Sequence, residues 1–224
     1  MTARLGALVL TISVLVSPLW GCESDDGGIL VIDLRTDYAP GVEVTAIRTV
    51  VHRGDAGGPI TTTTDTPVFV ASPLIDGLRV AETPGLEAGN YLVLTTLLDV
   101  AGEVLAEQRT REQVAGNIGV TVLITRSCAG VMCPAADPVA TACIGARCED
   151  PRCTPETPQF CSDMGCTDAR ACDAPAASCA EAQCIAGACF AAPIAGACGA
   201  EEACDPESGC VGVGPRCVPV VGVD

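Results

Sequence analysis

Residues 91–109, YLVLTTLLDVAGEVLAEQR, carry the clearest structural signal in this sequence. Residues 91–98 are almost all leucine, valine, threonine or tyrosine, a composition typical of a β-strand. The sequence DVAG at 99–102 predicts a turn. Residues 103–108 then predict a strand that returns beside the first one. This hairpin indicates a protein built from antiparallel β-structure.

Similar short segments lie on both sides of the hairpin. They cover residues 29–35, 42–53, 61–70, 78–82 and 119–125, and turn residues such as those at 40–41 separate them. No segment of this half has apolar residues at helical spacing over three turns. About seven short strands in about 100 residues predict a mostly β fold, an antiparallel β-sandwich over residues 29–126.

The sequence LEAGNY at residues 86–91 lies at the start of the strongest predicted strand. It resembles the tyrosine corner of immunoglobulin-like and fibronectin type III sandwiches. The resemblance implies that the Tyr91 hydroxyl bonds a backbone group a few residues upstream. A short motif of this kind supports a fold and says nothing about function.

The second half of the chain has a different composition. Residues 128–224 contain 15 of the 16 cysteines and no leucine, tryptophan or tyrosine, whereas residues 29–127 contain no cysteine. Alanine, glycine and proline bury too little apolar surface to order so long a segment. Disulfides stabilise such a segment instead, because each one lowers the entropy of the unfolded chain. For loops of this size each contributes about 3 kcal/mol to stability. Residues 127–224 are therefore predicted to form small, irregular, disulfide-stabilised modules.

The disulfide candidates are Cys128, Cys133, Cys143, Cys148, Cys153, Cys161, Cys166, Cys172, Cys179, Cys184, Cys189, Cys198, Cys204, Cys210 and Cys217. CIGARC at 143–148 and CIAGAC at 184–189 look like two copies of one unit, which predicts tandem repeats. The pairing itself is not deducible from spacing.

Metal binding is not expected in this region. It contains no C-x2-C pair and no histidine, so the usual ligand spacing of a structural zinc site is absent. Glu201, Glu202, Asp205 and Glu207 lack the ligand spacing of an EF-hand calcium loop. They are predicted to form a solvated acidic loop.

The first 21 residues are typical of a signal peptide. Arg4 precedes an apolar run at 5–16, which is shorter than the roughly 20 residues of a membrane span and is followed by Pro18. LWGC at 19–22 resembles the lipobox of bacterial lipoproteins, although Trp20 occupies a position that usually holds a small residue. The resemblance implies cleavage before Cys22 and acylation of Cys22, with residues 22–28 as the lipidated tether.

The cysteine count bears on this prediction. With Cys22 acylated, 15 cysteines remain, so one of them is left free or pairs with another chain. The alternative is an ordinary secretory signal, a non-lipidated protein and an even set of 16 cysteines.

Composition excludes several classes of function. The mature chain has 11 arginines and 28 acidic residues, a net charge of 11 − 28 = −17 that repels nucleic acid, so we expect no nucleic-acid partner. His52 is the only histidine, and the sequence has no G-x-S-x-G motif and no lysine for a phosphate-binding loop. We therefore assign no catalytic, cofactor-binding or metal-binding residue and expect a protein that is not an enzyme.

The chain as a whole resembles cysteine-rich bacterial surface lipoproteins. The resemblance implies export and a lipid anchor in the membrane, in the outer membrane facing the periplasm or the cell surface. We expect a non-enzymatic interaction or adhesion role toward an unidentified surface or protein ligand. One alternative is a disulfide-knot protease inhibitor or toxin-like module with 154–159 as its loop, and another is a hydrolase that uses paired acidic residues.

Overall fold

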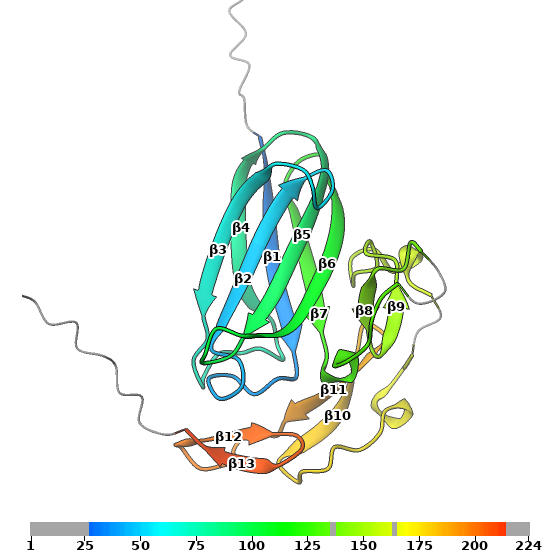
Figure 1. Cartoon of the computed structure of the whole chain (residues 1–224). Helices are drawn as coiled ribbons and strands as arrows, with labels where there is room; N and C mark the ends of the chain where they lie inside the picture. The colour runs from blue at the N-terminus through cyan, green and yellow to red at the C-terminus, as the bar shows by residue number, and fades with distance from the viewer. Residues whose placement is uncertain (1–26, 135–137, 163–164, 214–224) are drawn as a thin grey trace, which may run out of the picture.

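The first half of the chain is a sandwich of two β-sheets. The computed structural model describes residues 27–134, 138–162 and 165–213. Its first seven strands are β1 (Gly28–Thr36), β2 (Ala46–Arg53), β3 (Ile60–Pro67), β4 (Leu78–Leu86), β5 (Gly89–Leu98), β6 (Val104–Val114) and β7 (Ile118–Ile124). One sheet has the order β4-β1-β7 and the other β3-β2-β5-β6 (Figure 1). The predicted mostly β, antiparallel architecture is confirmed; the signal segment and Cys22 lie outside the described residues.

The strand order differs from that of the immunoglobulin fold. There the first and second strands are neighbours in one sheet. Here β1 lies between β4 and β7, and it pairs with β7 in parallel. The reason is the connection 37–45, which crosses from one sheet to the other and packs Tyr38 and Val44 into the core. The resemblance is therefore limited to the sandwich architecture and the tyrosine corner.

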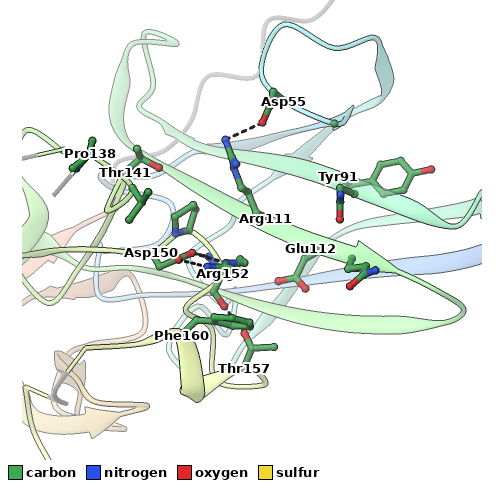
Figure 2. Close-up of a pocket in the computed structure, with 15 residues that line it drawn as sticks. Asp55, Tyr91, Arg111, Glu112, Pro138, Thr141, Asp150, Arg152, Thr157 and Phe160 are labelled. Carbon is green, nitrogen blue, oxygen red and sulfur yellow. Dashed lines mark hydrogen bonds and ion pairs between the residues drawn. The ribbon is translucent and has the colours of Figure 1, made fainter.

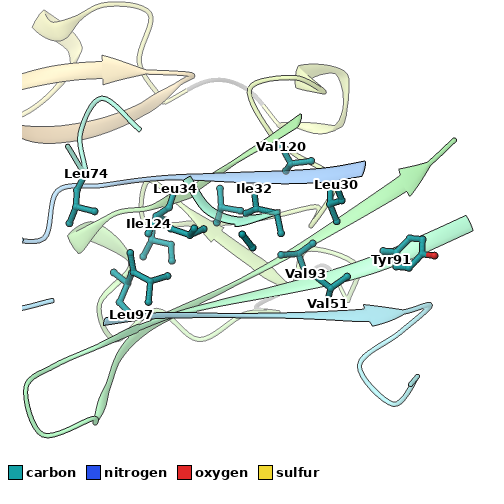
Figure 3. Close-up of a cluster of buried hydrophobic side chains, with 14 of the residues drawn as sticks. Leu30, Ile32, Leu34, Val51, Leu74, Tyr91, Val93, Leu97, Val120 and Ile124 are labelled. Carbon is teal, nitrogen blue, oxygen red and sulfur yellow. The ribbon is translucent and has the colours of Figure 1, made fainter. Parts of the chain in front are cut away.

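The core lies between the two sheets. Leu30, Ile32 and Leu34 alternate along β1 and are fully buried, as the two-residue period of a strand requires. They face Val93 and Leu97 of β5 across the sandwich (Figure 3). Each such side chain contributes about 1.5–3 kcal/mol through burial.

Four strand predictions needed correction. The strand predicted at 42–53 begins at Ala46, and the one predicted at 78–82 continues to Leu86. The strand predicted across 61–70 ends at Pro67, because the chain turns there and Phe69 is exposed. The strand predicted at 103–108 continues to Val114, pairing with β5 as far as Gly89. The second half of β6 contains charged residues, which do not indicate a strand in the sequence. An edge strand tolerates them on its exposed face.

The predicted tyrosine corner is present. The Tyr91 hydroxyl donates a hydrogen bond to the Glu87 carbonyl oxygen at 2.9 Å, while its ring is buried. This bond fixes the turn between β4 and β5.

The described part of the second half consists of three short hairpins joined by loops and single 3₁₀ turns (Figure 1). The hairpins are β8 (Ala142–Ile144) with β9 (Arg147–Glu149), β10 (Ala180–Ile185) with β11 (Ala188–Pro193), and β12 (Glu202–Asp205) with β13 (Gly209–Gly212). The 3₁₀ turns are η1 (Arg126–Cys128), η2 (Pro158–Phe160) and η3 (Ala169–Ala171).

Seven disulfides hold these hairpins. They are Cys128–Cys143, Cys133–Cys148, Cys153–Cys161, Cys166–Cys184, Cys172–Cys189, Cys179–Cys204 and Cys198–Cys210. Each hairpin has two cysteines facing each other across its strands, and each of these is bonded to a cysteine upstream in the same order. The two cysteines that these bridges do not use, Cys22 and Cys217, lie outside the described residues.

The two similar sequence units form the same local structure. Cys143 faces Cys148 in one hairpin, and Cys184 faces Cys189 in the other. In both hairpins the two turn residues have positive φ, at 57° and 67° for Gly145 and Ala146 and at 49° and 80° for Ala186 and Gly187. This is the geometry of a type I′ turn, which matches the twist of the paired strands.

Candidate functional site

The cysteine-rich region covers the side of the sandwich where β6 and β7 end their sheets. The Pro151 carbonyl oxygen accepts a hydrogen bond from the Arg111 N–H at 2.8 Å. The Glu156 carboxylate accepts bonds from the N–H of Thr121 at 3.1 Å and from its hydroxyl at 2.6 Å. Residues 151–156 thus satisfy backbone groups on the outer edges of β6 and β7, which would otherwise face water or another chain.

A small apolar cluster lies at the same interface between the sandwich and the cysteine-rich region. Leu123 of β7 packs with Ile144, Ala188 and Phe190 of the cysteine-rich hairpins, and Ile75 lies at the margin of the cluster. The region has few large apolar side chains of its own, so this contact with the sandwich forms much of its core.

A polar network around Arg126 joins the two parts further along. Its guanidinium pairs with Glu43 and lies 4.9 Å from the centre of the Tyr38 ring. The Asp37 carboxylate accepts hydrogen bonds from the N–H groups of Arg126 at 2.8 Å and of Ala191 at 3.4 Å. Burial raises the pKa of Asp37, although these N–H donors and the nearby guanidinium oppose the rise. The network holds the second hairpin against the sandwich.

Between these contacts lies a groove of about 710 Å³. Its walls come from the β2–β3 loop, the start of β5, the end of β6 and the segments 138–141 and 150–160. Figure 2 shows β6 crossing the groove, with side chains from the cysteine-rich region opposite it. The volume is in the range of ligand-binding clefts. Both parts of the chain contribute to it, and neither forms it alone.

Glu112 lies in this groove on the face of β6 that points toward the other sheet. Gln108, Thr110 and Val114 share that face and are buried. Gln108 accepts a hydrogen bond from the Cys143 N–H at 3.2 Å, whereas the Glu112 Oε1 atom is buried without a partner among the described residues. Burial, and secondarily the charge of Glu156, raises the pKa of Glu112 from 4.5 to about 7.

The other charged groups of the groove are paired. Arg111 lies 2.8 Å from the Asp55 carboxylate, and Arg152 lies 2.6 Å from that of Asp150. The Arg152 guanidinium also stacks 4.1 Å from the centre of the Phe160 ring (Figure 2). The arginine charges are therefore balanced locally, and the carboxyl of Glu112 is left as the group with unused bonding capacity.

The cysteines and acidic residues considered for metal binding have other roles in the structure. Sulfur atoms of Cys166, Cys172 and Cys189 lie close together, as do those of Cys179, Cys198 and Cys204. All six are in disulfides and so offer no thiolate. Asp205 accepts hydrogen bonds from the N–H of Glu207 at 2.8 Å and of Ser208 at 3.3 Å, which is the role of a turn-capping residue.

Two further features of the sequence, His52 and the loop 154–159, are held by contacts outside the polar centre of the groove. His52 is the last residue but one of β2, and its Nδ1 lies 3.2 Å from the Gly58 carbonyl oxygen, a local contact with the loop that follows the strand. The loop 154–159, considered as an inhibitory loop, is held to the sandwich by the bond between Glu156 and Thr121; Thr154 is buried, while Glu156, Pro158 and Gln159 are exposed.

Sequence reasoning missed Glu112 because the predicted strand stopped at residue 108. The signal was present in the alternation of Gln108, Thr110, Glu112 and Val114, which continues the inward-facing positions of β6. A polar residue at three successive inward positions indicates an edge that another part of the chain covers.

Comparison of the sequence with family models and curated proteins adds no relative. No protein-family model matches the chain, and no curated protein sequence matches it significantly. Within 27–134, 138–162 and 165–213, no helix is long and apolar enough to cross a membrane.

Proposed function

We propose that this is an exported, lipid-anchored protein of the bacterial cell envelope that binds a partner without catalysing a reaction. The observation that carries the binding role is the groove between the sandwich and the cysteine-rich region, which both parts line and in which Glu112 lacks a partner. The described residues bring no nucleophile and histidine base together there.

Export is supported by the disulfides. Seven bridges in one chain need an oxidising compartment, such as the periplasm or the cell surface. They also use every cysteine from Cys128 to Cys210, so the fold of the described residues does not require a bond from Cys22. The short tether before β1 would then place the sandwich near the membrane, with Cys22 available for acylation.

The anchor is tested by the intact mass of the native protein before and after reduction. We expect loss of residues 1–21, the added mass of acyl chains on Cys22, seven bridges and one further thiol at Cys217. A bridge between Cys22 and Cys217 would instead support the secreted, non-lipidated protein.

The binding role is tested in the producing bacterium. A deletion strain should lose a surface association, such as cell–cell aggregation or attachment, and the wild-type gene should restore it. Val139→Trp fills the groove from its exposed rim, and Val100→Trp makes the same change at the exposed β5–β6 turn. We expect Val100→Trp to restore the association and Val139→Trp to fail. Unchanged association in the deletion strain contradicts the proposal.

A further inference from the structure

The charges of the groove leave one group unbalanced. Arg111 pairs with Asp55 and Arg152 with Asp150, so these four charges sum to zero. Glu112 adds a carboxyl with no partner, and Glu156 lies close enough to raise its pKa further. Above the pKa of Glu112, the charges that line the groove therefore sum to the single negative charge of this carboxylate.

We infer that the groove binds a basic polypeptide segment of a protein partner and that Glu112 accepts the hydrogen bonds of a lysine or arginine side chain from it. This inference rests on the proposed function, since it names the ligand class of the same site. A cationic donor suits the position because an unsatisfied buried oxygen is costly. It is further attracted by the neighbouring charge of Glu156.

The remainder of the groove suits a peptide more than a small ion. Its volume of about 710 Å³ is larger than one side chain needs. Asn90, Gln113 and Thr141 line it with groups that can bond to a peptide backbone, and Pro138 and Val139 add apolar surface. The mature net charge of −17 would steer a basic partner toward this protein.

A divalent metal ion fits the site less well. Both oxygens of Glu156 already accept hydrogen bonds from Thr121. Among the described residues, no group of three candidate ligands includes Glu112. Calcium takes six or more oxygen ligands. Glu112 supplies one carboxylate, and the oxygens of its neighbour Glu156 are already used, so the site does not provide this number.

Binding should depend on pH, because a proton and the cationic ligand compete for Glu112. The charged groups around Glu112 are Glu156 from the loop covering β7, Arg111 on β6 itself, Asp55 from the β2–β3 loop, and Asp150 and Arg152 from the loop after β9. Tyr91 also lines the groove, and its hydroxyl donates to the Glu87 carbonyl oxygen. Each of these charged groups except Glu112 already takes part in a hydrogen bond or an ion pair. The cationic ligand therefore competes with a proton at Glu112.

The test uses the full-length lipidated protein in neutral phospholipid vesicles. The probe is a fluorescein-labelled nine-residue peptide of alternating lysine and glycine, and the matched control carries acetylated lysines. Fluorescence anisotropy gives Kd at pH 8 and at pH 5.5. Glu112→Gln removes the acceptor charge, and Glu107→Gln removes the same charge from the exposed face of the same strand.

We expect the lysine peptide to bind at pH 8 and the acetylated peptide not to bind. Binding should weaken at least tenfold at pH 5.5 and at least tenfold in Glu112→Gln, while Glu107→Gln binds like the wild type. Equal binding of both peptides, equal weakening by both variants, or stronger binding at pH 5.5 would each overturn the inference. If Val139→Trp abolishes surface association while no lysine peptide binds, the ligand class is wrong and the binding function stands. If the peptide binds as expected but the deletion strain associates normally, the function is wrong and the site stands.

Discussion

Replacing Glu112 by glutamine should change how the stability of the protein depends on pH. In the folded protein the pKa of Glu112 is raised from 4.5 to about 7. Between these values the folded chain binds a proton that the unfolded chain releases, so wild-type stability falls as pH rises. For a fully buried group the loss would reach roughly 3 kcal/mol at about 1.4 kcal/mol per pH unit. Because Glu112 is only partly buried, we expect about 1–2 kcal/mol.

Glutamine keeps the shape of the side chain and cannot ionise. At pH 4 the carboxyl of Glu112 is protonated in both states, so Glu112→Gln and the wild type should differ by less than about 0.5 kcal/mol. At pH 8 the variant should be the more stable by about 1–2 kcal/mol. The measurement is urea unfolding at constant ionic strength from pH 4 to pH 8, with disulfides intact and ligand absent.

The difference between the two curves isolates Glu112 from other groups, including Asp37, whose pKa burial also raises. Glu107→Gln serves as the control, because Glu107 is on the exposed face of β6. Its curve should run parallel to that of the wild type. If the Glu112→Gln curve also runs parallel across this range, the carboxyl is not held in a charge-disfavouring site and the account of the groove is refuted.

Three other changes test the structural argument by urea unfolding. Tyr91→Phe keeps the buried ring but removes the 2.9 Å bond to Glu87, and should lower the free energy of unfolding by about 1 kcal/mol; no change would mean that the corner bond is replaced by water without loss. Arg126→Met removes the cation that pairs with the half-buried Glu43 carboxylate and whose charge lies near the buried Asp37 carboxylate, and should cost about 2–4 kcal/mol. Arg48→Met breaks an exposed pair with Asp65, and stability should be nearly unchanged, so equal effects of the two arginine variants would count against the Arg126 network. Replacing Cys128 and Cys143 together by alanine opens a bridge of sequence separation 15 and should lower stability by about 3 kcal/mol, whereas an unaltered unfolding midpoint would show that the first hairpin is held by its packing alone.

The architecture of the first half was predictable because strands repeat every two residues. Leu30, Ile32 and Leu34 alternate in the sequence as they do in the core, and the short motif at 86–91 predicts the corner in which the Tyr91 hydroxyl bonds to Glu87. Strand order was not predictable in the same way. The pairing of β1 with β7 joins residues about 90 positions apart, and local sequence patterns carry no information on such contacts.

The disulfide pairing had the same limit. Spacing showed that CIGARC and CIAGAC were alike, and both form type I′ hairpins with facing cysteines. The partners of those cysteines lie 15 to 18 residues upstream, and only the folded arrangement selects them. Glu112 was missed for a related reason. Its pKa depends on Glu156 and on burial by the cysteine-rich region, and neither can be read from the residues next to it.

The polar inward face of β6 connects the fold to the proposed site. A sandwich edge with Gln108, Thr110 and Glu112 pointing inward is poorly suited to pack on an apolar core, so it needs a polar cover. The cysteine-rich region supplies that cover through the Cys143 N–H and the loop at 150–157, and gains a core contact at Leu123 in return. Gln108 is satisfied by this arrangement and Glu112 is not. The Glu112 carboxyl, without a partner at an interface whose other polar groups are bonded, lowers the stability of the protein. A cationic ligand that bonds to this carboxyl would remove that loss of stability.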